Sequence, residues 1–262
     1  MSNKIKNNYD IVLSIDLSRR EKMSTLEVLE LKYFYNDSVN CIFPVILRDD
    51  KEMILIDCGY PNSLELIKKA AKENNVDIGN LTKVIITHHD YDHMGSLAEI
   101  KRNYPSVEII SSIEEEKYVS GKVKSLRLKQ AEDIYDMLPE NEKAGAREFQ
   151  KQLEALENVF VDKCVEDGEV LNSCGGLEII STPGHMPGHI SIYVKESKTL
   201  ITGDAMVIEK GHLSIANPEY TLDMVSAKES IKKFMPYNIE KIICYHGGVL
   251  TNNIKEELEK VL

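Results

Sequence analysis

Three of the seven histidines in this 262-residue chain fall within six consecutive positions, 88–93, together with two aspartates. Neutral imidazole and carboxylate are the ligands that zinc, iron and manganese accept in proteins. The apolar run VIIT at 84–87 predicts a buried strand directly before this cluster, and a short helix is expected after it. The cluster is therefore expected in a loop at the carboxyl end of a strand. There, residues two apart can point the same way, which brings His88 and Asp90 together.

Three further segments repeat this design of an apolar strand followed by a polar residue in a glycine-containing turn. They read STPGHMPGH at 181–189, LITGDA at 200–205 and IICYHGG at 242–248, and they present His185, Asp204 and His246. A carboxylate can bridge two cations because each of its oxygens can serve one ion, which suits Asp204. Taken alone, the first cluster could be a polar surface turn. Four strand ends with the same chemistry favour a metal site instead.

The four motifs, in this order, resemble the metallo-β-lactamase-fold hydrolase superfamily. Its signature is HxHxDH after a strand, then a Pro-Gly-His turn, a Gly-Asp strand end and a final His-Gly. The resemblance runs from LIDCG at 55–59 to His246 and covers nearly the whole chain. It implies an α+β fold, a four-layer αββα sandwich in which two sheets are flanked by helices.

The resemblance also implies a site with two divalent metal ions. One ion would be held by His88, Asp90 and His185, the other by Asp92, His93 and His246, and Asp204 would bridge them. Two more residues are implied just behind the ligands, Asp57 and His189. For Asp57 the alternative is a strand-end turn residue, and for His189 a purely structural role. His89 is expected to face away from the metals, and His212 to lie at the surface or at the rim of a pocket.

One position departs from the common pattern, because Asp90 stands where the second histidine of HxH is usual. A carboxylate adds one negative charge and a harder oxygen donor than imidazole. This change is expected to strengthen the attraction for the first ion and to make iron or manganese more competitive. Zinc remains the expected metal, with iron and manganese as alternatives.

The activity that the resemblance implies is hydrolysis by a metal-bridging hydroxide, with a small ester, thioester or lactone as substrate. Asp92 would be the catalytic carboxylate that holds the water and passes a proton to the leaving group. The alternative is a di-iron oxidoreductase, because members of the superfamily with that activity carry a carboxylate at the position of Asp90. Those members usually carry a flavin domain, for which 262 residues leave no room after the motifs.

Residues 1–262 are predicted to form a single metallo-hydrolase domain. Segments 26–34 and 39–47 are expected to be strands, and Asp49-Asp50-Lys51 a hairpin turn before the next strand at 53–56. Segment 113–158 is charged and helical in pattern, which indicates a helical insertion. A lid over the site, a dimer contact and a surface decoration remain open as its role.

Composition narrows the range of partners. The formal net charge of −11 argues against a broad nucleic-acid surface. The densest basic run, at 122–129, is interpreted as a solvated helix face. Residues 1–10 lack the apolar stretch of a secretory signal, no apolar run approaches membrane-spanning length, and the five scattered cysteines are typical of reduced thiols. We therefore expect a cytoplasmic enzyme with a small-molecule substrate and no membrane or nucleic-acid partner; a homodimer stays open.

Overall fold

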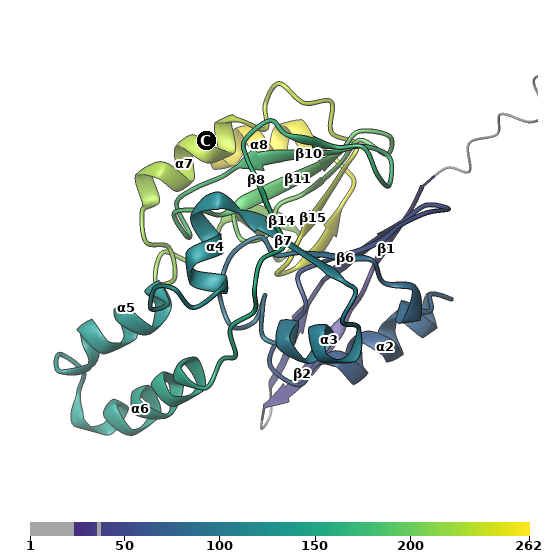
Figure 1. Cartoon of the computed structure of the whole chain (residues 1–262). Coiled ribbons are helices and arrows are strands. Elements are labelled where there is room, and N and C mark those ends of the chain that lie inside the picture. The colour runs from purple at the N-terminus through teal and green to yellow at the C-terminus, as the bar shows by residue number, and fades with distance from the viewer. Residues whose placement is uncertain (1–23, 36–37) are drawn as a thin grey trace, which may run out of the picture.

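The computed structural model describes residues 24–35 and 38–262, and two six-stranded sheets form its centre (Figure 1). Residues 1–10, which are predicted to carry no secretory signal, lie outside the described residues. In the first sheet the strand order is β1 (Thr25–Val28), β4 (Val45–Arg48), β5 (Met53–Ile56), β6 (Lys83–Ile85), β7 (Glu108–Ser112) and β8 (Lys163–Val165). Strands β5 to β8 run parallel to one another. Their carboxyl ends therefore meet at one edge of this sheet.

The second sheet is built from the later part of the chain. Its order is β16 (Gly248–Leu250), β15 (Lys241–Cys244), β12 (Thr199–Ile201), β11 (Ile190–Val194), β10 (Leu177–Ser181) and β9 (Val170–Leu171). Two hairpins complete the strands, β2 (Leu31–Tyr35) with β3 (Ser38–Ile42) and β13 (Met206–Glu209) with β14 (His212–Ile215). Strands β10, β12 and β15 confirm the apolar strands expected before the three later motifs. The β13–β14 hairpin was not predicted from the sequence.

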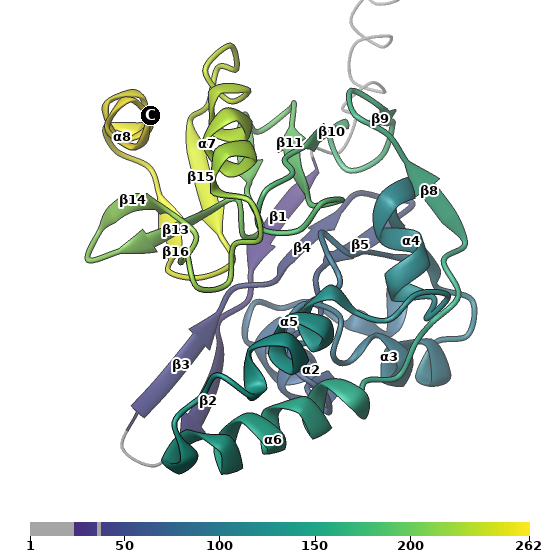
Figure 2. The same ribbon diagram turned by 90° about the vertical axis from the view of Figure 1, so that its left-hand side faces the viewer.

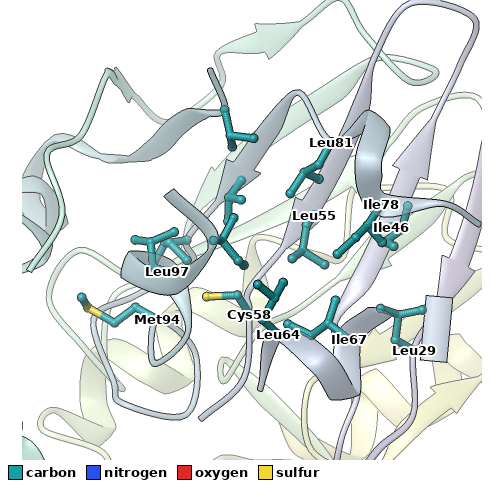
Figure 3. Close-up of a cluster of buried hydrophobic side chains, with 14 of the residues drawn as sticks. Leu29, Ile46, Leu55, Cys58, Leu64, Ile67, Ile78, Leu81, Met94 and Leu97 are labelled. Carbon is teal, nitrogen blue, oxygen red and sulfur yellow. The ribbon is translucent and has the colours of Figure 1, made fainter. Parts of the chain in front are cut away.

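Helices cover the outer face of each sheet, so the fold is an αββα sandwich. Helices α2 (Leu64–Glu73) and α3 (Leu97–Asn103) pack on the first sheet through a buried cluster that includes Leu55, Ile67 and Leu97 (Figure 3). Helices α7 (Met224–Lys232) and α8 (Ile254–Val261) cover the second sheet. Figure 2 shows these two pairs of helices at opposite ends of the molecule. The predicted four-layer α+β architecture is confirmed.

Strands with two buried faces explain the continuous apolar runs in the sequence. In β5, Ile54 and Ile56 point into the cluster between the two sheets, whereas Met53 and Leu55 point toward α2 and α3. Side chains alternate between the faces of a strand, so a strand covered on both sides must be apolar at every position. This arrangement places the core on both sides of each sheet and leaves the strand ends for polar residues.

The sequence prediction was wrong about the length of the first strands. Segment 26–34 divides into β1 and β2, and segment 39–47 divides into β3 and β4, so that the two halves of each belong to different sheets. The chain bends at Pro44, which has no N–H to continue a ladder, while its carbonyl accepts a hydrogen bond from Leu29 N at 2.8 Å. The hairpin predicted at 49–51 is confirmed, with Asp49 Oδ1 accepting bonds from Lys51 N and Glu52 N.

Segment 113–158 contains the helices α4 (Ile113–Val119), α5 (Leu126–Tyr135) and α6 (Glu140–Glu154). Helix α4 packs against β7 and β8, whereas α5 and α6 form a pair that projects from the body of the molecule (Figure 1). The pair has its own small core of Leu128, Ala131 and Leu153, which also contacts Tyr91. Its status as an insertion in one domain spanning 1–262 stays a prediction. Among the described residues, no helix combines the length and apolar character needed to cross a membrane.

Candidate metal centre

All the predicted ligand positions lie in loops that follow strands. His88, Asp90, Asp92 and His93 lie in the loop after β6, and His185 lies in the turn between β10 and β11. Asp204 follows β12 and His246 follows β15, two strands that pair in parallel and so end side by side. The strands themselves are mainly apolar, and the chemistry is gathered where they end.

The structure brings these loops together into two groups of side chains. His88, His185 and Asp204 form the first group, and Asp92, His93 and His246 form the second. Within each group, one ligand atom from every residue lies within 4.8 Å of the others. We call them the first and second ligand groups.

Asp204 reaches both groups. Its Oδ2 lies 3.6 Å from His185 Nε2 and 3.5 Å from His246 Nε2, and its Oδ1 lies 3.4 Å from His93 Nε2. The side chain is buried, with 6% of the residue exposed. A carboxylate in this position has one oxygen available for each of two neighbouring cations.

The buried ligand atoms fit a cation in a way that a hydrogen-bonded core would not. Three of them have no hydrogen-bond partner among the described residues: His88 Nε2, His93 Nε2 and Asp204 Oδ1. An unsatisfied buried polar atom costs roughly 1–3 kcal/mol, so three in one place are unfavourable unless a ligand binds there. Imidazole nitrogens and carboxylates are also the donors that zinc, iron and manganese prefer.

Asp57 lies behind His93, at the end of β5. His93 Nδ1 donates a hydrogen bond to Asp57 Oδ2 at 2.8 Å, which leaves Nε2 to face the ligand groups. Asp57 also accepts bonds from the backbone N and the hydroxyl of Thr87, both at 2.8 Å. A carboxylate that fixes the tautomer and orientation of a histidine in this way supports metal ligation.

His189 lies under Asp204. Its Nε2 accepts a hydrogen bond from Asp204 N at 2.9 Å, and its Nδ1 is 2.8 Å from Thr182 Oγ1. Burial, with the neighbouring His185, lowers the pKa of His189 to about 3. The ring is therefore neutral and can accept the bond that orients the Asp204 loop.

The remaining two histidines lie away from the ligand groups. His89 stacks on Tyr118 with ring centroids 4.3 Å apart, and its ring contacts Glu115 and Leu126 N. His212 is largely exposed and pairs with Glu257 at 3.2 Å. Both placements match the sequence-based expectation.

Arg127 is the residue at this site that the sequence reasoning missed. It belongs to the basic run at 122–129 that was interpreted as a solvated helix face, yet only 4% of Arg127 is exposed. The guanidinium forms a two-pronged ion pair with Asp90, Nε to Oδ1 at 3.1 Å and Nη2 to Oδ2 at 2.6 Å. A signal was present, because Arg127 lies four positions before the apolar Ala131 and so on the same face of α5.

Asp90 therefore sits between the first ligand group and Arg127. Its Oδ2 lies 3.0 Å from His185 Nε2 and 3.5 Å from His88 Nε2. Burial opposes ionisation, but Arg127 and then His185 hold the pKa of Asp90 well below its usual range. Asp90 is an ionised carboxylate at the edge of the first group.

The histidines of the two groups lie in different electrostatic surroundings. Burial disfavours the charged form of His246, but Asp204 and Asp92 outweigh it and raise the pKa of His246 to about 10. Asp204, Asp57 and Asp92 likewise overcome burial and hold the pKa of His93 well above its usual range. For His88, burial and the neighbouring His93 lower the pKa well below the usual range.

This difference predicts that metal affinity depends strongly on pH. The raised pKa of His246 keeps its ring protonated below about pH 10, and a metal must displace that proton. The apparent zinc affinity should fall by about tenfold per pH unit, for each proton displaced, as the pH is lowered from 8 to 6. Chelator-competition titrations at pH 6, 7 and 8 measure this slope.

The variant His246→Ala provides the internal comparison for this titration. It removes one of the protonated rings, so the slope for the ion assigned to Asp92, His93 and His246 should be smaller by one proton. An affinity that stays constant between pH 6 and 8 in the unmodified protein would contradict the prediction.

The ligand groups open into a cavity of about 470 Å³. Its walls come from several parts of the fold: the β2–β3 hairpin, the β6 loop, α5 and α6, the β13–β14 hairpin and the loop before α7. The apolar and aromatic members of the lining are Tyr60, Tyr91, Phe149, Val207, Ile208, Ala216 and Tyr220. Among the described residues that line the cavity, Arg127 is the one lysine or arginine.

Comparison with known proteins identifies the family of this chain. The sequence profile described as the metallo-beta-lactamase superfamily matches residues 37–246. The chain is 28% identical over 238 residues to the probable metallo-hydrolase YflN of Bacillus subtilis, covering 85% of this chain and 86% of that protein. It is 29% identical over 216 residues to the hydroxyacylglutathione hydrolase GloC of Haemophilus influenzae, covering 81% and 87%.

The fold is also similar to that of solved metallo-beta-lactamase structures. The metallo-beta-lactamase family protein TTHA1429 from Thermus thermophilus superposes with a TM-score of 0.69 at 19% identity, over 90% of this chain and 77% of that one. The chain therefore belongs to the metallo-beta-lactamase superfamily, as a metal-dependent hydrolase.

Proposed function

We propose that this protein is a dinuclear enzyme that hydrolyses small, uncharged esters, thioesters or lactones. The observation that carries the proposal is the pair of ligand groups sharing Asp204 at the base of a mainly apolar cavity. We assign one ion to His88, His185 and Asp90, the other to Asp92, His93 and His246, and the bridge to Asp204. Zinc is the proposed metal, with iron or manganese as alternatives.

Two bound divalent ions would supply a hydroxide at neutral pH and would polarise the carbonyl oxygen of the substrate. The protein's own contribution to the proton transfers comes from Asp92. Its Oδ2 lies 3.3 Å from His246 Nε2, and its side chain is partly open to the cavity. We assign Asp92 the role of holding the attacking water and passing its proton to the leaving group.

The loop that carries Asp92 is held from the second sheet. Tyr245 donates its hydroxyl hydrogen to Asp92 O at 2.6 Å and accepts a bond from Gly59 N at 3.1 Å. Its neighbour in sequence is His246, so one strand end positions both a ligand and the catalytic loop. Such a fixed arrangement holds reacting groups in place before the substrate arrives.

The cavity supports an uncharged substrate. Relatives include hydroxyacylglutathione hydrolases, and glutathione thioesters carry two carboxylates. In the described cavity wall Arg127 is the one lysine or arginine, and its guanidinium already forms an ion pair with Asp90. The aromatic side chains Phe149 and Tyr220 instead suit an apolar acyl or alkyl group.

A matched pair of thioesters tests this substrate class. The same acyl group is attached either to glutathione or to the neutral thiol N-acetylcysteamine, and kcat/KM is measured for both with zinc-loaded protein. We expect the neutral thioester to be preferred by about tenfold, since the described cavity wall offers the two carboxylates of glutathione no unpaired lysine or arginine beyond the metal ions. Equal rates, or a preference for the glutathione thioester, would exclude an uncharged-substrate cavity.

The same preparations test the redox alternative and the wider substrate range. A panel of neutral aryl esters and lactones is assayed beside the thioesters, and oxygen consumption is followed after loading with iron. Hydrolysis without oxygen consumption is the expected result. Oxygen uptake by a protein that hydrolyses none of the panel would favour the di-iron oxidoreductase instead.

The cytoplasmic location, and the monomeric or dimeric state, stay predictions from the sequence. The cavity walls contain residues from the β2–β3 hairpin, α5 and α6, which makes the α5–α6 pair part of the substrate site in this proposal. Phe149 of α6 contributes to the wall, and Arg127 of α5 contacts Asp90.

A further inference from the structure

Arg127 reaches the first ligand group from a helix outside the sandwich. Besides its two bonds to Asp90, its Nη2 donates to Tyr220 O at 2.8 Å and lies 3.4 Å from His185 Nε2. Its Nη1 donates to Gln130 Oε1 at 2.6 Å. The guanidinium is thus held on three sides at the edge of a metal-ligand group.

The position of Arg127 is fixed by the same loops that carry the ligands. His89 Nε2 accepts a hydrogen bond from Leu126 N, the residue just before Arg127, at 3.2 Å. Glu115 of α4 accepts bonds from His89 N at 2.9 Å and from Gly188 N at 3.1 Å, and so ties the β6 loop to the His185 turn. The start of α5 is therefore anchored beside Asp90.

The two ligand groups differ in charge because of this contact. The second group contains Asp92 and lies beside the shared Asp204 and, behind His93, Asp57. In the described chain, no lysine or arginine makes an ion pair with any of these three aspartates. The first group has the shared Asp204 and Asp90, and Arg127 neutralises Asp90. A divalent cation is attracted by each nearby carboxylate and repelled by the guanidinium.

We propose that Arg127 makes the two metal sites unequal, so that the Asp92–His93–His246 site fills first and the site at His88, Asp90 and His185 binds its ion more weakly. The inference rests on the proposed dinuclear function. In it, Arg127 is a positioning residue that shares Asp90 with the metal and offsets the negative charge that aspartate adds in place of histidine. The α5–α6 pair then sets metal affinity as well as lining the cavity.

Three variants test the inference by zinc binding to the full-length, metal-free protein. Arg127→Gln removes the charge, Arg127→Lys keeps the charge but loses the two-pronged geometry, and Arg147→Gln is the matched control. Arg147 lies on α6, and it also bonds a glutamine, Gln150, at 2.8 Å, but it is half exposed and lies outside the ligand groups. Circular dichroism and thermal unfolding verify that each variant is folded.

Competition with a chelating indicator gives the affinities of the two zinc ions. For the unmodified protein we expect two ions whose affinities differ by at least about tenfold. The outer partners of metal ligands alter metal affinity by about 10- to 100-fold. Because the partner removed here is a cation that repels the metal ion, Arg127→Gln should tighten the weaker ion by about tenfold or more. In Arg127→Lys and Arg147→Gln, the affinity for the weaker zinc ion should stay within about threefold of its value in the unmodified protein.

Cobalt(II) absorption assigns the sites. His246→Ala should remove the spectrum of the tightly bound ion, and His185→Ala that of the weakly bound ion. Equal affinities in the unmodified protein, or a weaker ion that Arg127→Gln leaves unchanged or loosens, would overturn the inference while the dinuclear function stands. A protein that binds no zinc would overturn the proposed function and the inference with it.

Discussion

Replacing Asp204 by alanine is expected to reduce turnover by about 10³-fold or more. Among the described residues, Asp204 is the carboxylate that approaches histidines of both ligand groups, with oxygens 3.4–3.6 Å from His93, His185 and His246. Without it the two ions lose their shared ligand. Charge stabilisation by metal ions contributes several kcal/mol to such a transition state, and each 1.4 kcal/mol corresponds to about tenfold in rate.

The measurement combines kcat with the number of zinc ions bound per protein. We expect the fold to persist, because the hydrogen bond from Asp204 N to His189 belongs to the backbone and survives the substitution. Glu209→Ala is the matched control, since Glu209 is an acidic residue of the same cavity outside both ligand groups, and it should keep most of the activity. Normal turnover in Asp204→Ala protein that holds two metal ions would contradict the bridging role.

Removing the metal ions with a chelator is expected to abolish activity and to lower the melting temperature by about 10 °C. The stability effect follows from mass action, because an ion present at about 1,000 times its dissociation constant stabilises the folded state by about 4 kcal/mol. For a chain of this size 1 kcal/mol corresponds to about 2–4 °C. The unpaired buried atoms His88 Nε2, His93 Nε2 and Asp204 Oδ1 give the structural reason, since the metal ions would be their partners.

Adding back zinc, iron(II) or manganese(II) one at a time identifies the working metal. The ion that restores both activity and melting temperature at the lowest concentration is the best candidate, and we expect zinc. The comparison with iron matters because Asp90 is a harder donor than histidine. Activity that survives complete metal removal would exclude a metal-dependent mechanism altogether.

The motifs predicted which side chains gather because each one contains both a strand and the residue at its end. Strands that converge, as β12 and β15 do in parallel, finish at one edge, and this is why Asp204 and His246 are neighbours as expected. The same argument placed His88 and His93 beyond β6. The sequence motif also separated His89 from the others, and its ring does turn away toward Glu115.

Local pattern was less informative about the strands before β5. An apolar, β-branched run predicts extended backbone, but it does not show where one strand leaves a sheet and another begins. The bend at Pro44 and the bond from Leu29 N to Pro44 O divide both runs between different sheets. The β13–β14 hairpin was missed because its residues, 206–215, follow directly on the Gly-Asp motif and give only a short pattern of their own.

By itself, the sequence determined the four strand-end motifs and the metal chemistry, because apolar runs and ligand type are local properties of the chain. The sandwich followed from the resemblance that these motifs carry. The tertiary structure alone decided the partner of Asp90. Arg127 is 37 positions away in sequence, in a helix whose charge pattern resembles a solvated face. Its burial depends on how α5 is anchored by His89 and on the position of Tyr220, and no local pattern encodes contacts between such distant segments.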